Sequence, residues 1–196
     1  MQTKPDTMSA RFFGYGSLVN RATHDYPGAQ PASLTGWRRV WVHAPVRPVA
    51  FLSVEPAPGV TIAGLVAKVP GADWAALDAR EFAYARHPVM AATDAGAVAA
   101  QVYAVPQGQP SSLHHPILLS YLDAVVQGFL REYGPAGAEA FFATTAGWDA
   151  PMLNDRAAPR YPRAQALTRA ERATVDAALA ALGVRPRLPG PQTPGQ

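Results

Sequence analysis

Arg11-Phe12-Phe13-Gly14-Tyr15-Gly16-Ser17-Leu18 is the stretch that decides the fold of this chain, because an apolar strand runs directly into a tight glycine turn. Glycines on both sides of Tyr15 let the backbone approach a ligand closely and leave amide N–H groups pointing outward. Such a turn suits a small anionic or carbonyl-bearing molecule. The sequence therefore predicts a binding site at the end of the first strand.

The composition indicates one globular domain. The chain has 196 residues, 48% of them apolar and 16% charged, which is enough apolar surface to form a core. No run approaches eighteen apolar residues, so no membrane span is expected. The polar start lacks a secretory signal, which makes the cytoplasm the default location. We expect a loose N-terminus over 1–10, one domain over 11–183 and a proline- and glycine-rich tail over 184–196.

Cysteine and charge content exclude several classes of site. The chain has no cysteine, so disulfides, thiolate zinc sites and a cysteine nucleophile are ruled out. The net charge is +3, but the arginines are scattered along the chain. A surface that follows nucleic-acid phosphates usually needs clustered positive charge, so no nucleic-acid partner is expected.

Apolar runs in the first seventy residues predict a sheet or barrel. After the strand that leads into the glycine turn, we expect strands at 33–44, 49–54 and 61–69, the last two separated by a turn at 55–59. Residues 20–31 are expected to form a loop that borders a pocket. Extended chain at 86–90 and a strand at 99–105 complete the predicted β structure.

Helical spacing dominates the second half of the chain. Asp73 is a plausible N-cap for a short helix ending near Glu81, and Pro116 suits the first position of a long helix through Leu130. Further helices are expected at 138–144 and at 169–182, the latter with Gly183 as its C-cap. Strands first and helices later indicate an α+β fold with a small mixed, barrel-like sheet and flanking helices.

Common catalytic motifs are missing. Val19 stands where a dinucleotide fingerprint needs its third glycine, and Ser17 does not lie in a Gly-x-Ser-x-Gly elbow. The five histidines show no spacing typical of metal ligands, so neither a metal nor another cofactor is predicted. They are His24, His43, His87, His114 and His115.

Glu81 is the best candidate for a chemical role. At the end of the short helix its negative charge would lie at the negative end of the helix dipole, which is unfavourable by a few tenths of a kcal/mol. Leu77, Phe82 and Tyr84 are apolar or aromatic, and partial burial among them would raise the pKa of Glu81 toward the range useful for proton transfer. The structural alternative is a surface glutamate paired with Arg80 or Arg86.

Four segments together resemble a known family. Phe13-Gly14-Tyr15-Gly16-Ser17-Leu18, Leu34-Thr35-Gly36-Trp37-Arg38-Arg39-Val40-Trp41, Gly64-Leu65-Val66 and Leu77-Asp78-x-Arg80-Glu81 match the γ-glutamylcyclotransferase superfamily in order and spacing. This superfamily includes the ChaC-like and AIG2-like proteins. The similarity covers about residues 11 to 105, and the later helix with Ser120-Tyr121-Leu122-Asp123 resembles that of bacterial members less specifically.

The resemblance implies a γ-glutamylcyclotransferase-like fold and a cofactor-independent enzyme. Its pocket would take a γ-glutamyl amide and release 5-oxoproline, with Glu81 as general base and then general acid. The turn of Tyr15, Gly16, Ser17 and Leu18 would hold the γ-glutamyl group through backbone amides. Arg39 would support the site, and Tyr121 would hydrogen-bond the substrate.

Two questions stay open at this point. The chain has Val19-Asn20-Arg21 where glutathione-specific members carry an aromatic, which argues against glutathione as the substrate. The leaving amine is expected to be read by the loops at 20–31 and 106–116. The alternative function is a non-catalytic protein that binds a small metabolite or a partner through the same pocket.

Overall fold

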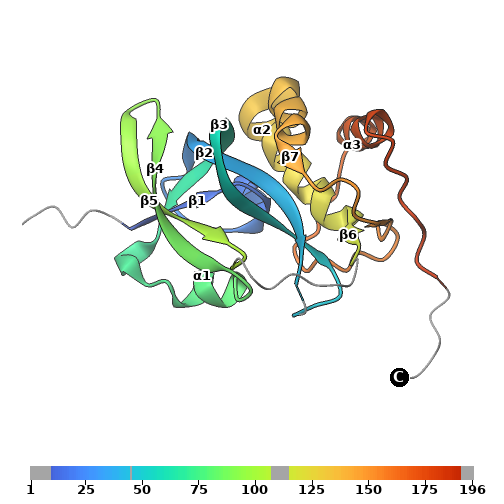
Figure 1. Ribbon diagram of the computed structural model, residues 1–196, viewed down its shortest axis with the longest axis horizontal. Helices are drawn as coiled ribbons and strands as arrows, with labels where there is room; N and C mark the ends of the chain where they lie inside the picture. Colours follow the sequence, from blue (N-terminus) through green and yellow to red (C-terminus); the bar gives the residue numbers. More distant parts are fainter. Residues whose placement is uncertain (1–9, 45, 107–114, 191–196) are drawn as a thin grey trace, which may run out of the picture.

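The computed structural model describes residues 10–44, 46–106 and 115–190 and shows a β-barrel with helices on one side and at one end (Figure 1). His114, most of the predicted 106–116 loop and both chain ends therefore lie outside the described residues. The elements are β1 (Arg11–Gly14), β2 (Gln30–His43), β3 (Ala50–Lys68), α1 (Ala75–Arg80), β4 (Ala85–Thr93), β5 (Gly96–Ala104), β6 (Ile117–Leu118), α2 (Leu119–Ala143), β7 (Thr145–Ala146), β8 (Met152–Leu153) and α3 (Arg169–Ala181).

The main sheet closes on itself. Its strand order is β3-β1-β5-β4-β2-β7, and a further pairing of β2 with β3 joins the first five into a barrel. The central β1 is parallel to β5 and antiparallel to β3, whereas β4 pairs antiparallel with β5. The predicted α+β fold with a mixed, barrel-like sheet is confirmed.

The predicted turn at 55–59 is wrong, because β3 is one strand of 19 residues that runs through it. The register of the β2–β3 pair shifts at this point, from Thr35 opposite Thr61 to Trp37 opposite Pro56. The extra residues of β3 bulge out of the ladder, and Gly59 supplies a positive φ of 82° there. Local proline and glycine content thus marks a bulge in a long strand rather than a connection between two strands.

The helices agree with the predicted periodicity. The N-cap of α1 is Trp74 rather than the predicted Asp73, although Asp73 Oδ1 accepts the Ala75 N–H at 3.0 Å. Glu81 is the C-cap of this helix. The predicted helix start at Pro116 is wrong, because Ile117–Leu118 form β6 and α2 begins only at Leu119. α2 then covers most of both predicted helices, which are separated by a break at Gly134 and Pro135. α3 opens with a capping box of Thr168 and Glu171.

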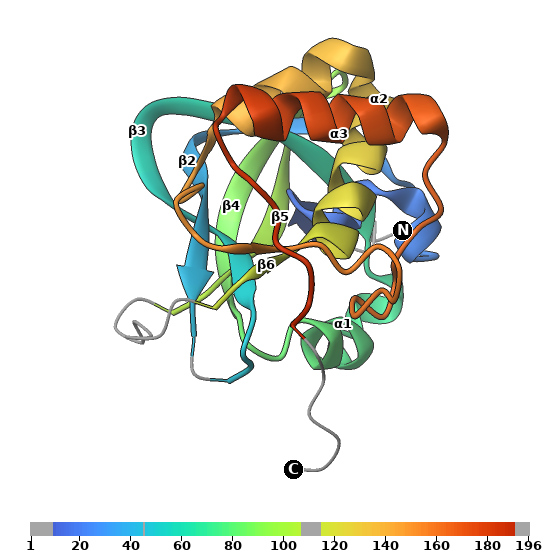
Figure 2. The same cartoon turned by 90° about the vertical axis from the view of Figure 1, so that its right-hand side faces the viewer.

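α2 and α3 cover one side of the barrel, and α3 crosses over α2 (Figure 2). In the part of the chain that the structure describes, no helix is both long and apolar enough to cross a membrane. Beyond α3 the chain returns to the domain, because the Arg187 N–H donates to the Met152 carbonyl at 2.8 Å. The beginning of the predicted tail is therefore attached to β8.

Arg39 is a large charged residue in the core, with only 1% of its surface exposed. Its guanidinium donates from Nε to the Tyr15 carbonyl at 2.9 Å, from Nη1 to the Thr144 hydroxyl at 2.9 Å, and from Nη2 to the Ala63 carbonyl. It also lies over the rings of Phe129 and Phe141, at 4.8 and 5.2 Å from their centroids. One side chain of β2 therefore joins the glycine turn, β3 and the end of α2.

Burial lowers the pKa of Arg39 to about 9, so the side chain is still a cation at neutral pH. Among the described residues no carboxylate pairs with it. Its charge is balanced by neutral oxygens and aromatic faces instead.

We expect Arg39→Met to lower the free energy of unfolding by about 3 kcal/mol, because one buried and two partly buried acceptors lose their donor. The neighbouring Arg38→Met is the matched control, since Arg38 is half exposed and pairs with Glu55 on the surface. The control should cost less than about 1 kcal/mol. Urea denaturation measures both values, and equal losses in the two variants would contradict the structural role of Arg39.

Candidate active site

Two adjoining cavities lie beside the glycine turn. The inner one has a volume of about 30 Å³ and the outer one about 270 Å³. They share Ser17, Leu52, Glu81, Tyr84 and Tyr121, so they form one recess with a narrow floor and a wider mouth. The predicted Tyr15, Gly16, Ser17 and Leu18 all line the inner cavity together with Glu81 and Tyr121.

The glycine turn is held against α2 at contact distance. A Cβ on Gly16 would lie 2.7 Å from the Tyr121 hydroxyl oxygen and 3.2 Å from a Leu52 methyl group. The neighbouring Ser17 backbone amide lowers the pKa of the Tyr121 hydroxyl and so opposes part of the increase that burial causes. Gly16 is therefore required because an aromatic hydroxyl occupies the space of its missing side chain.

Tyrosines surround the floor of the recess. The Tyr15 hydroxyl donates to the Tyr103 carbonyl at 2.6 Å, and the Tyr84 hydroxyl donates to the Leu52 carbonyl at 3.0 Å. Burial raises the pKa of Tyr15, Tyr84 and Tyr121, and the nearby Glu81 charge raises these pKa values further. All three are neutral hydrogen-bonding groups at physiological pH.

Glu81 lies at the C-terminus of α1 with 16% of its side-chain surface exposed. The nearest cation is Arg80, whose Nε is 3.2 Å from Glu81 Oε1. Arg80 also donates to the Thr23 carbonyl at 2.8 Å and to the Ser17 hydroxyl at 3.2 Å. The ion pair thus fixes the carboxylate relative to the glycine turn.

Burial raises the pKa of Glu81, and the positive charges of Arg80 and Arg163 oppose part of this increase. The alternative of a surface glutamate is therefore wrong, because Glu81 is mostly buried, although the predicted pairing with Arg80 is present. Arg86 pairs instead with Asp78 at 3.1 Å. A carboxyl group in this setting can exchange a proton nearer to neutral pH than a solvated glutamate can.

Not every predicted residue reaches the recess. Arg39 lines neither cavity, and it acts on the site only through the Tyr15 carbonyl that it binds. None of residues 20–31 lines the recess either, because the Asn20 side chain turns toward α2 and donates to the Ala124 carbonyl at 2.8 Å. The predicted loop over 20–31 is therefore packed against the helix rather than around the ligand site.

The sequence did not point to the residues at the mouth. Among them are Arg47, Phe51, Arg160, Tyr161 and Arg163, which come from the β2–β3 connection, β3 and the segment that follows β8. Tyr161 packs edge-on against Tyr121, with ring centroids 5.0 Å apart. These segments carry no motif, and only their placement in space reveals them.

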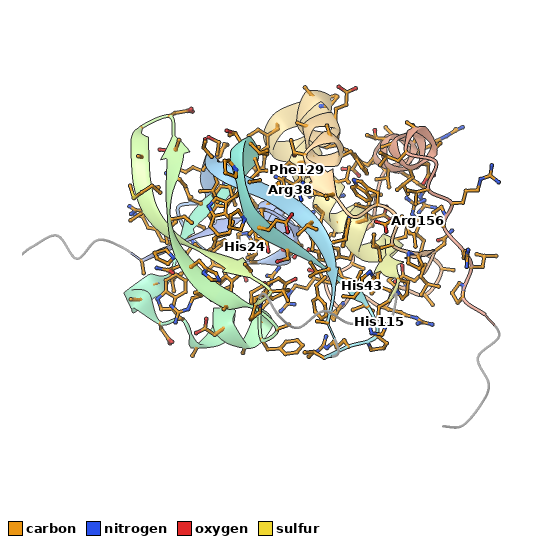
Figure 3. All side chains as sticks on the ribbon, viewed as in Figure 1. His24, Arg38, His43, His115, Phe129 and Arg156 are labelled. Carbon is orange, nitrogen blue, oxygen red and sulfur yellow. The ribbon has the colours of Figure 1, made fainter. Side chains whose placement is uncertain are left out.

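The four described histidines do not gather into a metal site. His43 and His115 are neighbours with ring centroids 6.2 Å apart, whereas His24 lies well away from both (Figure 3). Within the ranges that the structure describes, no three His, Asp or Glu side chains are grouped so as to hold a metal ion.

The end of β1, the glycine turn, Glu81 and Tyr121 all lie within the region that one family model matches. A model of the γ-glutamyl cyclotransferase, AIG2-like family matches residues 12–121, more than half of the chain. The chain belongs to this family. Membership in the γ-glutamyl cyclotransferases supports an activity of that general type, and the matched region ends at the site residue Tyr121.

Solved structures share the fold of this γ-glutamyl cyclotransferase family member. A gamma-glutamyl cyclotransferase and an uncharacterized protein from Homo sapiens each give a TM-score of 0.57 at 17% identity, covering 86% of this chain and 99% of theirs. YkqA from Bacillus subtilis gives 0.57 at 17% identity, covering 71% of this chain and 56% of its own. No curated protein sequence matches the chain significantly.

The contact between Gly16 and Tyr121 gives a test by a double-mutant cycle. Gly16→Ala should destabilise the protein by about 1–3 kcal/mol, because the new methyl group would overlap the Tyr121 hydroxyl. Tyr121→Phe removes that oxygen, so Gly16→Ala should cost less in the Tyr121→Phe background. Urea denaturation of the four proteins measures the coupling. Strictly additive losses would show that the two residues are not in contact.

Proposed function

We propose that this protein cyclises a γ-glutamyl amide to 5-oxoproline and a free amine, with Glu81 transferring the proton. The observation that carries the proposal is a buried carboxylate placed beside a glycine turn. Among the described residues that line the recess, Glu81 is the only acid. The family match supports the same reaction type.

The reaction needs little from the protein beyond folding the substrate and moving a proton. The α-amine of the γ-glutamyl group attacks its own γ-carbonyl carbon, a C–N bond forms, and a five-membered ring closes. Glu81 takes a proton from the attacking nitrogen and delivers it to the departing one as the original amide C–N bond breaks. Atoms balance without any cofactor, because the nucleophile belongs to the substrate.

The surroundings of Glu81 suit this role. Arg80 holds the carboxylate next to the turn, and the neutral tyrosines Tyr84 and Tyr121 offer hydrogen bonds without a competing charge. We assign the backbone amides of the turn from Tyr15 to Leu18 to binding of the γ-glutamyl group and of the oxyanion that develops during ring closure. Arg39 is a positioning residue, since it holds the Tyr15 carbonyl.

The first test is 5-oxoproline release, detected by mass spectrometry, from γ-glutamyl amino acids, γ-glutamyl amines and glutathione. Glu81→Gln keeps the size of the side chain but cannot exchange a proton, so kcat/KM should fall by about 10³-fold. Asp78→Asn is the matched control, because Asp78 is a half-exposed carboxylate of the same helix that pairs with Arg86. It should leave turnover within about threefold of wild type.

The Glu81→Gln protein should also stay folded. The raised pKa of Glu81 means that the folded protein favours the protonated, neutral form of this side chain over the anion. The contribution of Glu81 to the free energy of unfolding is therefore lost as the pH rises through that pKa and the carboxyl group ionises. A neutral glutamine should therefore leave the melting temperature at pH 8 unchanged or higher. No release from any γ-glutamyl compound by folded wild type, together with retained ligand binding, would instead favour the non-catalytic binding protein.

The pH dependence of kcat/KM gives a second test of Glu81 as the base. The carboxylate must be ionised to accept a proton, and burial raises its pKa, so the acidic limb should lie above the pKa of about 4.3 of a solvated glutamate. Arg163→Gln removes a positive charge that lowers the pKa of Glu81, so the limb should move to higher pH.

Arg169→Gln is the control for this pH experiment. Arg169 is exposed on α3 and does not line the recess, so the acidic limb should keep its wild-type position. A wild-type limb at the ordinary pKa of glutamate would contradict the assignment of Glu81.

A further inference from the structure

Three exposed arginines surround the mouth of the outer cavity. They are Arg47, Arg160 and Arg163, and Glu81 at the floor is the only acidic residue among the described residues that line the same cavity. No ion pair joins any of the three to a carboxylate within residues 10–44, 46–106 and 115–190. The mouth therefore carries positive charge that no carboxylate of the described residues pairs with.

The segment that carries Arg160 and Arg163 is anchored by a buried acid. The Asp155 carboxylate accepts the Arg160 backbone N–H at 2.9 Å, and it also accepts the backbone N–H and the hydroxyl of Ser120 at 2.8 and 2.6 Å. The Tyr161 N–H donates to the Ser120 hydroxyl oxygen at 3.3 Å. These bonds fix the segment against the start of α2, one residue before Tyr121.

Arg47 reaches the mouth from a different segment of the chain, the connection between β2 and β3. Its guanidinium lies over the Phe82 ring, 4.6 Å from the centroid. Phe82 follows Glu81 directly and also lines the cavity, although it is half exposed. The Phe82 ring thus holds the positive charge of Arg47 at the mouth of the cavity that Glu81 also lines.

The proposed reaction fixes which part of the substrate meets these arginines. The γ-glutamyl group must reach the glycine turn and Glu81 on the floor, so the leaving amine extends outward through the wider cavity. Guanidinium groups bind carboxylates through charge-assisted hydrogen bonds and repel ammonium groups. A leaving amine that carries a carboxylate should therefore bind at the mouth more tightly than one that carries an ammonium group.

We propose that Arg47, Arg160 and Arg163 form a leaving-group subsite for carboxylates, so that the preferred leaving amine is an α-amino acid, and an acidic amino acid above a neutral one. This inference rests on the proposed function. It selects γ-glutamyl amino acids over γ-glutamyl amines as the substrate class.

A series of substrates that differ in leaving-group charge tests the subsite. We expect kcat/KM to decrease from γ-glutamyl-glutamate to γ-glutamyl-alanine, then to γ-glutamyl-alaninamide, and finally to the γ-glutamyl amide of 1,4-diaminobutane. Replacing the alanine carboxylate by its amide should lower kcat/KM about tenfold, mainly because KM rises. Added salt should weaken the reaction of the two carboxylate substrates more than that of the alaninamide.

Arg160→Gln is the most direct variant, because Arg160 does not contribute to the shifted pKa of Glu81. It should raise KM for γ-glutamyl-alanine about three- to tenfold and leave the alaninamide unaffected. Arg169→Gln removes the same charge far from the recess and should change neither substrate. Arg47→Gln combined with Arg160→Gln should reduce the preference for the carboxylate further.

The outcomes separate this inference from the proposed function. Release of 5-oxoproline from the alanine and alaninamide substrates with equal kcat/KM would overturn the carboxylate subsite and leave the cyclisation standing. The same holds if Arg160→Gln slows both substrates equally. If folded protein releases 5-oxoproline from none of the substrates, the cyclisation itself is overturned.

Discussion

The buried guanidinium of Arg39 is the interaction on which the rest of the structure depends. A charged side chain in an apolar core is tolerated only if its hydrogen bonds are satisfied, and Arg39 satisfies them with oxygens from three distant segments. Because one of these is the Tyr15 carbonyl, the glycine turn cannot shift without breaking a bond in the core. The strand that carries Arg39 thereby determines where the glycine turn lies relative to α2.

The site is built around a group that folding alone would not favour. Glu81 ends a helix at its negative pole and is mostly buried, and both placements disfavour its ionised form. Arg80 compensates for part of this cost while it also holds the glycine turn. A single arginine therefore serves as counter-ion and as spacer between the acid and the turn, which is consistent with a carboxyl group selected for proton transfer rather than for stability.

Much of this arrangement could be predicted from the sequence, because its signals are local. The glycine turn, the helix ending at Glu81 and the periodicity of α2 each depend on a few neighbouring residues. Contacts between residues far apart in the sequence determine the features that could not be predicted. Residues 55–59 have the composition of a turn, yet pairing along the whole of β2 keeps β3 continuous. Arg39 resembles a site residue in its motif, but its direction into the core could be known only once β2 and α2 were placed.

Two parts of the chain form the recess, which explains why its floor could be predicted from the sequence more easily than its mouth. The glycine turn, Glu81 and Tyr121 all lie within the region that matches the family, whereas Arg160, Tyr161 and Arg163 lie beyond its end. The later segment reaches the mouth because Asp155 binds Ser120 at the start of α2, next to Tyr121. A change of residues at 160–163 can therefore alter the charge at the mouth of the recess while Glu81 and the glycine turn keep their geometry. Under the proposed function, such a fold keeps one reaction and varies the amine that it releases.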